Sequence, residues 1–172
     1  MPVIINGSTG ISGTNGSAST PAVQGTDTNT GMYFPGADRI AFAEGGVQVG
    51  EFDASGNFLF NSGYGSVATA YGCRAWVHFN GTGTVAIRAS GNVSSITDNG
   101  AGDYTVNFTN AMSDTNYAVL AMNGVFNSGN QPIGFYESAS TARTASLVRL
   151  FSSQGTGAIA IDGDRVSVIV FR

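Results

Sequence analysis

The sequence predicts an almost purely β protein, and three observations carry that prediction. Glycine supplies 25 of the 172 residues, which disfavours long helices. Only 10% of the residues are charged, while Ser, Thr and Asn are abundant, a composition typical of short strands joined by tight turns. Apolar and polar side chains alternate with a period of two in several short runs, which places successive side chains on opposite faces of a sheet.

The alternation is clearest in the stretch 73–123. Four strand-like runs follow one another there, at residues 73–80, 84–90, 104–109 and 117–121. Asn80-Gly81 ends the first run, which predicts a hairpin with the second. Asp98-Asn99-Gly100 supplies residues that tolerate positive φ, which predicts a turn before the third run. The pattern therefore predicts a half-buried antiparallel meander.

Four further strand candidates follow in the C-terminal part. They are residues 131–138, 145–151, 158–162 and 165–172, and we expect the last two to form a hairpin across Gly163-Asp164. The run 165–172 is apolar on both faces, which is typical of a central strand or of a strand between chains. Eight strand candidates in residues 73–172 predict a C-terminal antiparallel β-sandwich, or head domain.

The first 31 residues contain few sizeable apolar side chains, separated by glycine-rich and serine-rich stretches. Such a segment cannot bury itself. We expect it to be an extended attachment arm that becomes ordered against other chains.

Apolar side chains become more frequent from residue 32, in strands of three to five residues that predict a short β shaft over 32–62. The run Phe58-Leu59-Phe60 is too short to make a core within one chain, so its aromatic surface needs other strands to cover it. Threefold association would supply them. Residues 63–72 are glycine-bounded and small, and we interpret them as the joint to the head domain. The candidate trimer-interface residues are Phe34, Phe42, Phe58, Phe60, Ile169 and Phe171.

Charge, cysteine content and apolar runs argue against nucleic-acid binding, an internal disulfide and membrane insertion. The chain has no lysine, and its seven basic residues are arginines, so nucleic acid is not an expected partner. Residues 1–72 carry five acidic residues against Arg39, a net charge of −4, whereas residues 73–172 carry six of each sign. Cys73 is the single cysteine, which excludes an internal disulfide, and we expect it to be buried. The chain shows no apolar run of about 18 residues for membrane insertion and no secretory pattern at its N-terminus.

Two stretches resemble tailed-bacteriophage fibre proteins. The run GTDTNTGMYFPGADRIAFAEGGVQVGEFDASGNFLF at 25–60 resembles a fibre segment of the general form SDTNTGIY-PGAD-LAF-TGG-----ID-SGN. The run at 74–119, which begins RAWVHFNGTGTVAIRASGNV, is similar to a module of phage and prophage tail fibres. The resemblance implies a virion appendage. Because the N-terminus lacks a secretory pattern, we expect synthesis in the host cytoplasm. The resemblance further implies a parallel homotrimer whose N-terminal arm attaches to other virion proteins and whose C-terminal end is exposed. It brings no catalytic residues.

Few residues form constellations that could carry chemistry. Cys73 and His78 are separated by five positions, which would place them on opposite faces of one strand, so we do not expect a nucleophile–base pair. Asp162-Gly163-Asp164 could present oxygen atoms to calcium, but it also fits a turn without a metal. We expect no enzymatic activity, no metal and no cofactor.

An aromatic plane beside a guanidinium suits a sugar ring, which could stack on the ring and form hydrogen bonds at its edge. The candidate receptor-binding residues, for a host-surface glycan, are Tyr71, Arg74, Trp76, His78, Asn127 and Asn130, with the loops 110–116 and 124–131. Trp76 could instead pack in the sandwich or between subunits. Two other classes stay open: a trimeric capsid decoration (head fibre, knob or cement protein) and, with less support from the few glutamates, a depolymerase tailspike.

Overall fold

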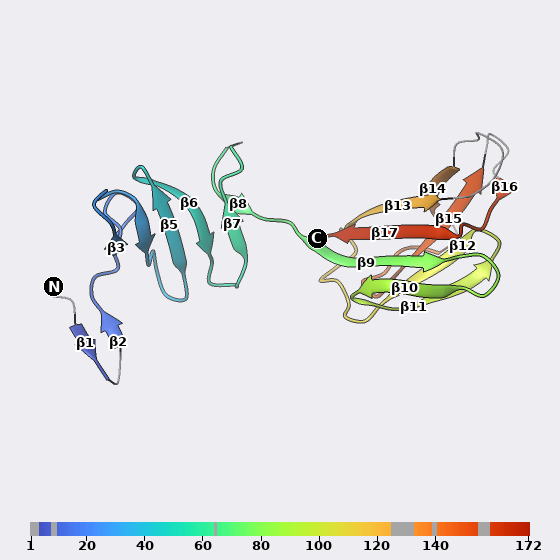
Figure 1. The fold of residues 1–172 in the computed structure, drawn as a ribbon, viewed down its shortest axis with the longest axis horizontal. Helices are drawn as coiled ribbons and strands as arrows, with labels where there is room; N and C mark the ends of the chain where they lie inside the picture. The colour runs from blue at the N-terminus through green and yellow to red at the C-terminus, as the bar shows by residue number, and fades with distance from the viewer. Residues whose placement is uncertain (1–3, 8–9, 64, 125–132, 139–140, 155–158) are drawn as a thin grey trace. The chain divides into compact units, whose positions relative to one another are not determined.

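The computed structural model describes residues 4–7, 10–63, 65–124, 133–138, 141–154 and 159–172 (Figure 1). Within these residues the chain forms antiparallel strands and no helix, which confirms the prediction of an all-β protein. The chain divides into two compact units, Met1–Ala70 and Tyr71–Arg172. The division falls inside the segment 63–72.

The first unit is built from strands that pair in chain order. The hairpin of β1 (Ile4–Asn6) and β2 (Gly10–Ser12) stands apart from a six-stranded sheet. That sheet contains, in sequence, β3 (Val23–Gln24), β4 (Gly31–Tyr33), β5 (Ile40–Glu44), β6 (Val47–Phe52), β7 (Phe58–Phe60) and β8 (Ala68–Thr69). The sheet therefore begins within the predicted arm and ends within the predicted joint.

The second unit is a sandwich of two antiparallel sheets. Its strands are β9 (Cys73–Asn80), β10 (Ala86–Gly91), β11 (Val93–Gly100), β12 (Asp103–Phe108), β13 (Ala118–Gly124), β14 (Ile133–Glu137), β15 (Leu147–Gln154), β16 (Ile159–Ala160) and β17 (Arg165–Phe171). One sheet has the order β10-β9-β17-β13. The other has the order β11-β12-β15-β14, with β16 paired to β15. Strand β17 is central, as its apolar faces indicate.

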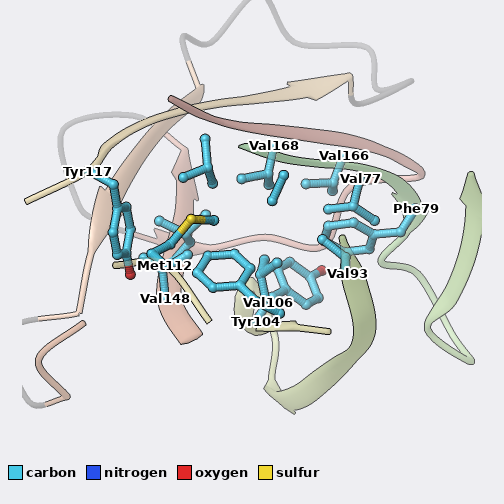
Figure 2. Packing of buried hydrophobic residues seen from close by; sticks show 14 residues of the cluster. Val77, Phe79, Val93, Tyr104, Val106, Met112, Tyr117, Val148, Val166 and Val168 are labelled. Atoms are coloured by element: carbon cyan, nitrogen blue, oxygen red, sulfur yellow. The ribbon is translucent and has the colours of Figure 1, made fainter. Parts of the chain in front are cut away.

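The core of the second unit lies between the two sheets (Figure 2). The period-two pattern is confirmed there, because Val77 and Phe79 of β9 and Val166 and Val168 of β17 are at most 1% exposed. From the other sheet, the Tyr104 ring meets Phe79 edge to face, with centroids 5.1 Å apart. Burial of each such side chain stabilises the fold by about 1.5 to 3 kcal/mol.

The predicted hairpin across Gly163-Asp164 is wrong. Strand β16 pairs with β15, whereas β17 pairs with β9 and β13 in the opposite sheet. Residues 161–164 cross between the sheets, and Asp162 Oδ1 anchors them by accepting hydrogen bonds from the Gly102 amide (2.7 Å) and the Tyr104 hydroxyl (2.8 Å). These contacts join Asp162 to residues about 60 positions earlier in the sequence, and they outweigh the preference of Gly163-Asp164 for a local hairpin turn.

Strand β11 was not among the expected strands. Asp98, Asn99 and Gly100, expected as a turn, belong to this strand, and the turn consists of Ala101 and Gly102 instead. Most of β11 is exposed at the edge of its sheet, so its sequence has few apolar residues to show a period. The hydroxyl groups of β11 support its pairing with β12, because the Asn107 side-chain amide of β12 donates hydrogen bonds to the hydroxyls of Ser95 and Thr97.

Cys73 is exposed, so the expectation that it is buried is wrong. The pairing of β9 with β17 shifts register at this point: Val170 pairs with Ala75, and Phe171 pairs with Cys73. The extra residue, Arg74, is a β-bulge, and it breaks the alternation that holds from Ala75 onward.

Asn92 forms the corner at which the chain passes from one sheet of the sandwich to the other. It is the single residue between β10 and β11, and its φ of 55° is in the left-handed region. Its side-chain amide donates to the carbonyl oxygens of Arg74 (3.0 Å) and Asn110 (3.1 Å), and its Oδ1 accepts from the Asn110 amide (2.8 Å). Asparagine suits this position because it tolerates this φ and supplies both hydrogen-bonding groups.

Two variants of Asn92 should separate these contributions. Asn92→Gly keeps the backbone free to adopt the left-handed conformation but loses the hydrogen bonds, and we expect a loss of about 1 to 3 kcal/mol. Asn92→Ala also meets the steric cost of positive φ, so it should lose about 1 kcal/mol more. Denaturant unfolding followed by the fluorescence of Trp76, the only tryptophan, measures both. Equal stability of the two variants would contradict the role given to backbone conformation.

Candidate functional site

The six-stranded sheet of the first unit carries an uncovered aromatic face. Cross-strand partners share a face, and the pairing aligns Ile40 with Phe52 and Phe58 in one row. Phe42, Gly50 and Phe60 form the adjacent row. We call Ile40, Phe42, Phe52, Phe58 and Phe60 the aromatic face.

The side chains of the aromatic face contact one another yet stay open to solvent. Phe52 and Phe58 have ring centroids 5.3 Å apart, and the rings of Phe58 and Phe60 are stacked at 6.4 Å. A Cβ at Gly50 would meet the Phe58 and Phe42 rings at 3.7 and 3.8 Å, an ordinary van der Waals contact, so both rings pack close to this glycine. All five side chains are between 38% and 47% exposed. Monomeric proteins rarely expose apolar side chains in such a contiguous group.

Sequence reasoning named Phe42, Phe58 and Phe60 of this face and missed Ile40 and Phe52. The signal for Ile40 was present, because it alternates with Phe42 at period two. Phe34, also named, lies beyond the end of β4 and is half-buried, with its amide donating to the Asn15 carbonyl (2.8 Å).

The opposite face of the sheet carries two alanines, one tyrosine and a network of polar side chains. Its buried residues Tyr33, Ala41 and Ala43 pack with Ala18. Glu51, 1% exposed, accepts hydrogen bonds from Arg39 Nε and from Gln48 Nε2 (2.5 Å), while the Tyr33 hydroxyl donates to Gln48 Oε1 (2.8 Å). The hydrogen bond from Arg39 lowers the pKa of Glu51. Burial raises the pKa of the Tyr33 hydroxyl. This polar network fixes the side chains beneath the sheet.

The lowered pKa of Glu51 predicts a pH-dependent contribution to stability. A carboxyl whose folded pKa lies below its ordinary value of 4.5 stabilises the fold above that value, and the contribution disappears as pH falls through the folded pKa. We therefore expect Glu51→Gln to melt below the parent at pH 7 and the difference to shrink below pH 4.5. Thermal unfolding followed by circular dichroism measures this, with the exposed Glu44→Gln as the charge-matched control. A difference independent of pH would contradict the role of the carboxylate.

The candidate receptor-binding residues are not brought together as one site. Trp76 and His78 share the outer face of β9, opposite the buried Val77. Trp76 is 43% exposed, and its ring covers Gly91, where a Cβ would lie 2.5 Å from the indole nitrogen. Arg74, at the bulge, lines a separate depression of about 550 Å³ that also includes Cys73. Asn127 and Asn130 lie outside the described residues.

His78 lies between Ser167 and Arg88. Its Nδ1 is 3.1 Å from Ser167 Oγ, and its Nε2 is 3.4 Å from Arg88 Nη1. Since a guanidinium only donates, Nε2 is the acceptor, and Nδ1 carries the proton toward Ser167. The bulge at Arg74 means that Cys73 and His78 need not lie on opposite faces of β9. They are nevertheless separated by roughly 15 Å of strand, which is too far for a nucleophile–base pair.

Tyr71 lies apart from these residues, just before β9. It is 74% exposed and lines a pocket of about 390 Å³ with Phe171. Ile169, the other candidate trimer residue of β17, pairs with Trp76 on the outer face of the sheet and is 39% exposed.

Within the described residues, no group of three or more His, Cys, Asp or Glu side chains is arranged to hold a metal ion. The same part of the chain contains no helix long and apolar enough to cross a membrane. Comparison with family models, with curated proteins and with solved structures finds no match.

Proposed function

We propose that this chain is a structural subunit of a tailed-bacteriophage virion appendage of the tail-fibre type, a homotrimer whose second unit binds a host-surface glycan. The single observation that carries the assembly is the aromatic face. It spans β5, β6 and β7 on one side of a sheet whose own buried core consists of Tyr33, Ala41 and Ala43. A sheet with one apolar face is stable only when a second layer covers that face.

A second copy of the chain is the partner that best fits this face. The five side chains of the aromatic face carry no charge, so no oppositely charged partner is called for. Every copy exposes the same aromatic face, and association between copies would bury the aromatic face of each copy. The resemblance of residues 25–60 to fibre segments supports threefold rather than twofold association.

The other parts of the proposal follow the resemblance. Residues 1–31 attach the trimer to other virion proteins, and Phe34 and Ile169 stay predicted subunit contacts. Three linked second units would let weak single sites give strong attachment, because each bound unit raises the effective concentration of the others.

Light scattering on the purified chain in non-denaturing buffer tests the assembly. We expect a mass three times the 17.6 kDa of one chain, and a monomer would refute the proposal. Antibody labelling of particles then decides between a tail appendage and a head decoration protein. Signal at the tail supports the fibre, and signal at the head supports the decoration protein.

A further inference from the structure

The pocket beside Tyr71 lies entirely within the second unit. Its lining residues come from the segment before β9, the start of β13 and the end of β17: Tyr71, Asn116, Ala118, Phe171 and Arg172. Strand pairing holds two of them together, because Ala118 pairs with Phe171. The volume of about 390 Å³ falls in the range of small-molecule pockets.

The walls combine two aromatic rings with polar groups that have unused hydrogen-bonding capacity. Tyr71 is 74% exposed and Phe171 is 38% exposed. Among the described residues, neither the Tyr71 hydroxyl nor the Asn116 side-chain amide has a hydrogen-bond partner. Arg172 donates to Ser113 Oγ from Nε (3.2 Å) and to Asp114 from Nη2, which leaves Nη1 without a partner in the described part.

The charge of the pocket indicates which ligands it suits. The only cation in the lining, Arg172, is paired with the Asp114 carboxylate, so the pair presents no net charge. An anionic sugar or a phosphate would meet that carboxylate beside the guanidinium. A neutral sugar needs only an aromatic surface for its C–H face and donors and acceptors for its hydroxyls, and this pocket offers both.

We propose that this pocket binds one neutral pyranose unit of a glycan, with Tyr71 stacking on the ring and Asn116 and Arg172 donating hydrogen bonds to its hydroxyls. The inference rests on the proposed function only for its glycan partner, since the pocket is formed within one chain. It assigns Phe171 to the pocket wall rather than to a subunit contact. It also moves the sugar site away from Trp76, one side of whose ring is occupied by Gly91.

Saturation-transfer NMR on the intact chain tests the assignment. The probes are the methyl glycosides of glucose, galactose, mannose and N-acetylglucosamine, with the methyl glycoside of N-acetylneuraminic acid as the anionic comparison. We expect at least one neutral glycoside to bind with a millimolar dissociation constant. Tyr71→Ala should weaken that binding about tenfold, whereas Tyr71→Phe keeps the ring and should stay within about threefold of the parent.

Tyr136→Ala is the matched control, because Tyr136 is an exposed aromatic residue (47%) outside the pocket, and it should bind as the parent does. The assignment is overturned if no neutral glycoside binds, if binding is indifferent to Tyr71→Ala, or if the anionic glycoside binds most tightly. The proposed function is judged separately by mass. A trimer without Tyr71-dependent binding refutes the pocket alone, and a monomer that binds the glycoside refutes the homotrimer alone.

Discussion

Phe58→Ser is expected to weaken the homotrimer about a hundredfold, and Phe58→Ser combined with Phe60→Ser about ten-thousandfold. Each ring is a little under half exposed in the single chain, so covering the rest contributes about 1 kcal/mol per ring in each chain. The loss is repeated in three chains, giving about 3 kcal/mol for one substitution and about 6 for two, at 1.4 kcal/mol per tenfold. Light scattering across a dilution series measures the dissociation.

The control for these variants is Tyr136→Ser. Tyr136 is 47% exposed, close to the 45% of Phe58, but it belongs to the second unit, where it stacks on Phe151. We expect this variant to keep the mass of the parent at every concentration. If Phe58→Ser also keeps the parent mass at the lowest concentration, the aromatic face does not lie between subunits.

Tyr104→Ala is expected to unfold the second unit at ordinary temperature, with a loss of about 3 to 5 kcal/mol from the removed ring. Tyr104 is 1% exposed, and its hydroxyl lies 2.8 Å from Asp162 Oδ1 and 3.0 Å from the Gly81 carbonyl oxygen. Burial, together with the bond to Asp162, raises the pKa of this hydroxyl, which keeps it protonated as a donor. The substitution therefore also removes the donor that serves both acceptors.

Tyr104→Phe separates the two effects, because it keeps the ring against Phe79 and removes only the hydroxyl. We expect it to lose about 1 to 3 kcal/mol, the cost of leaving a buried acceptor without its partner. Unfolding followed by the fluorescence of Trp76 reports on the second unit alone, since the first unit contains no tryptophan. Equal losses in the two variants would mean that the ring contributes nothing beyond its hydroxyl.

The parts of the fold that depend on local pattern could be predicted from the sequence. The alternation in β9, β12 and β17 reports directly which side chains point inward, because one face of each strand is buried. Strand β11 could not be found in this way, since an exposed edge strand has little apolar sequence. The path of residues 161–164 depends on Asp162 meeting Gly102 and Tyr104, residues about 60 positions away, which no local pattern reveals.

The candidate sites divide along the same line. Phe42, Phe58 and Phe60 were named because aromatic side chains on short strands need other strands to cover them, and Ile40 could have been named by the same reasoning. Proximity in sequence suggested one site from Tyr71 to His78, but a bulge at Arg74 redirects the strand. Phe171, distant in sequence, is the residue that meets Tyr71 in the pocket.

The strand order has a consequence for biosynthesis. The six-stranded sheet pairs neighbours in chain order, so it can form as soon as residue 69 has left the ribosome. The four-stranded sheet must wait for residues 165–171, because β17 lies at its centre. Local contacts form faster than distant ones. In the proposed homotrimer, chains emerging from neighbouring ribosomes on one message can therefore join through their aromatic faces before either has completed its second unit.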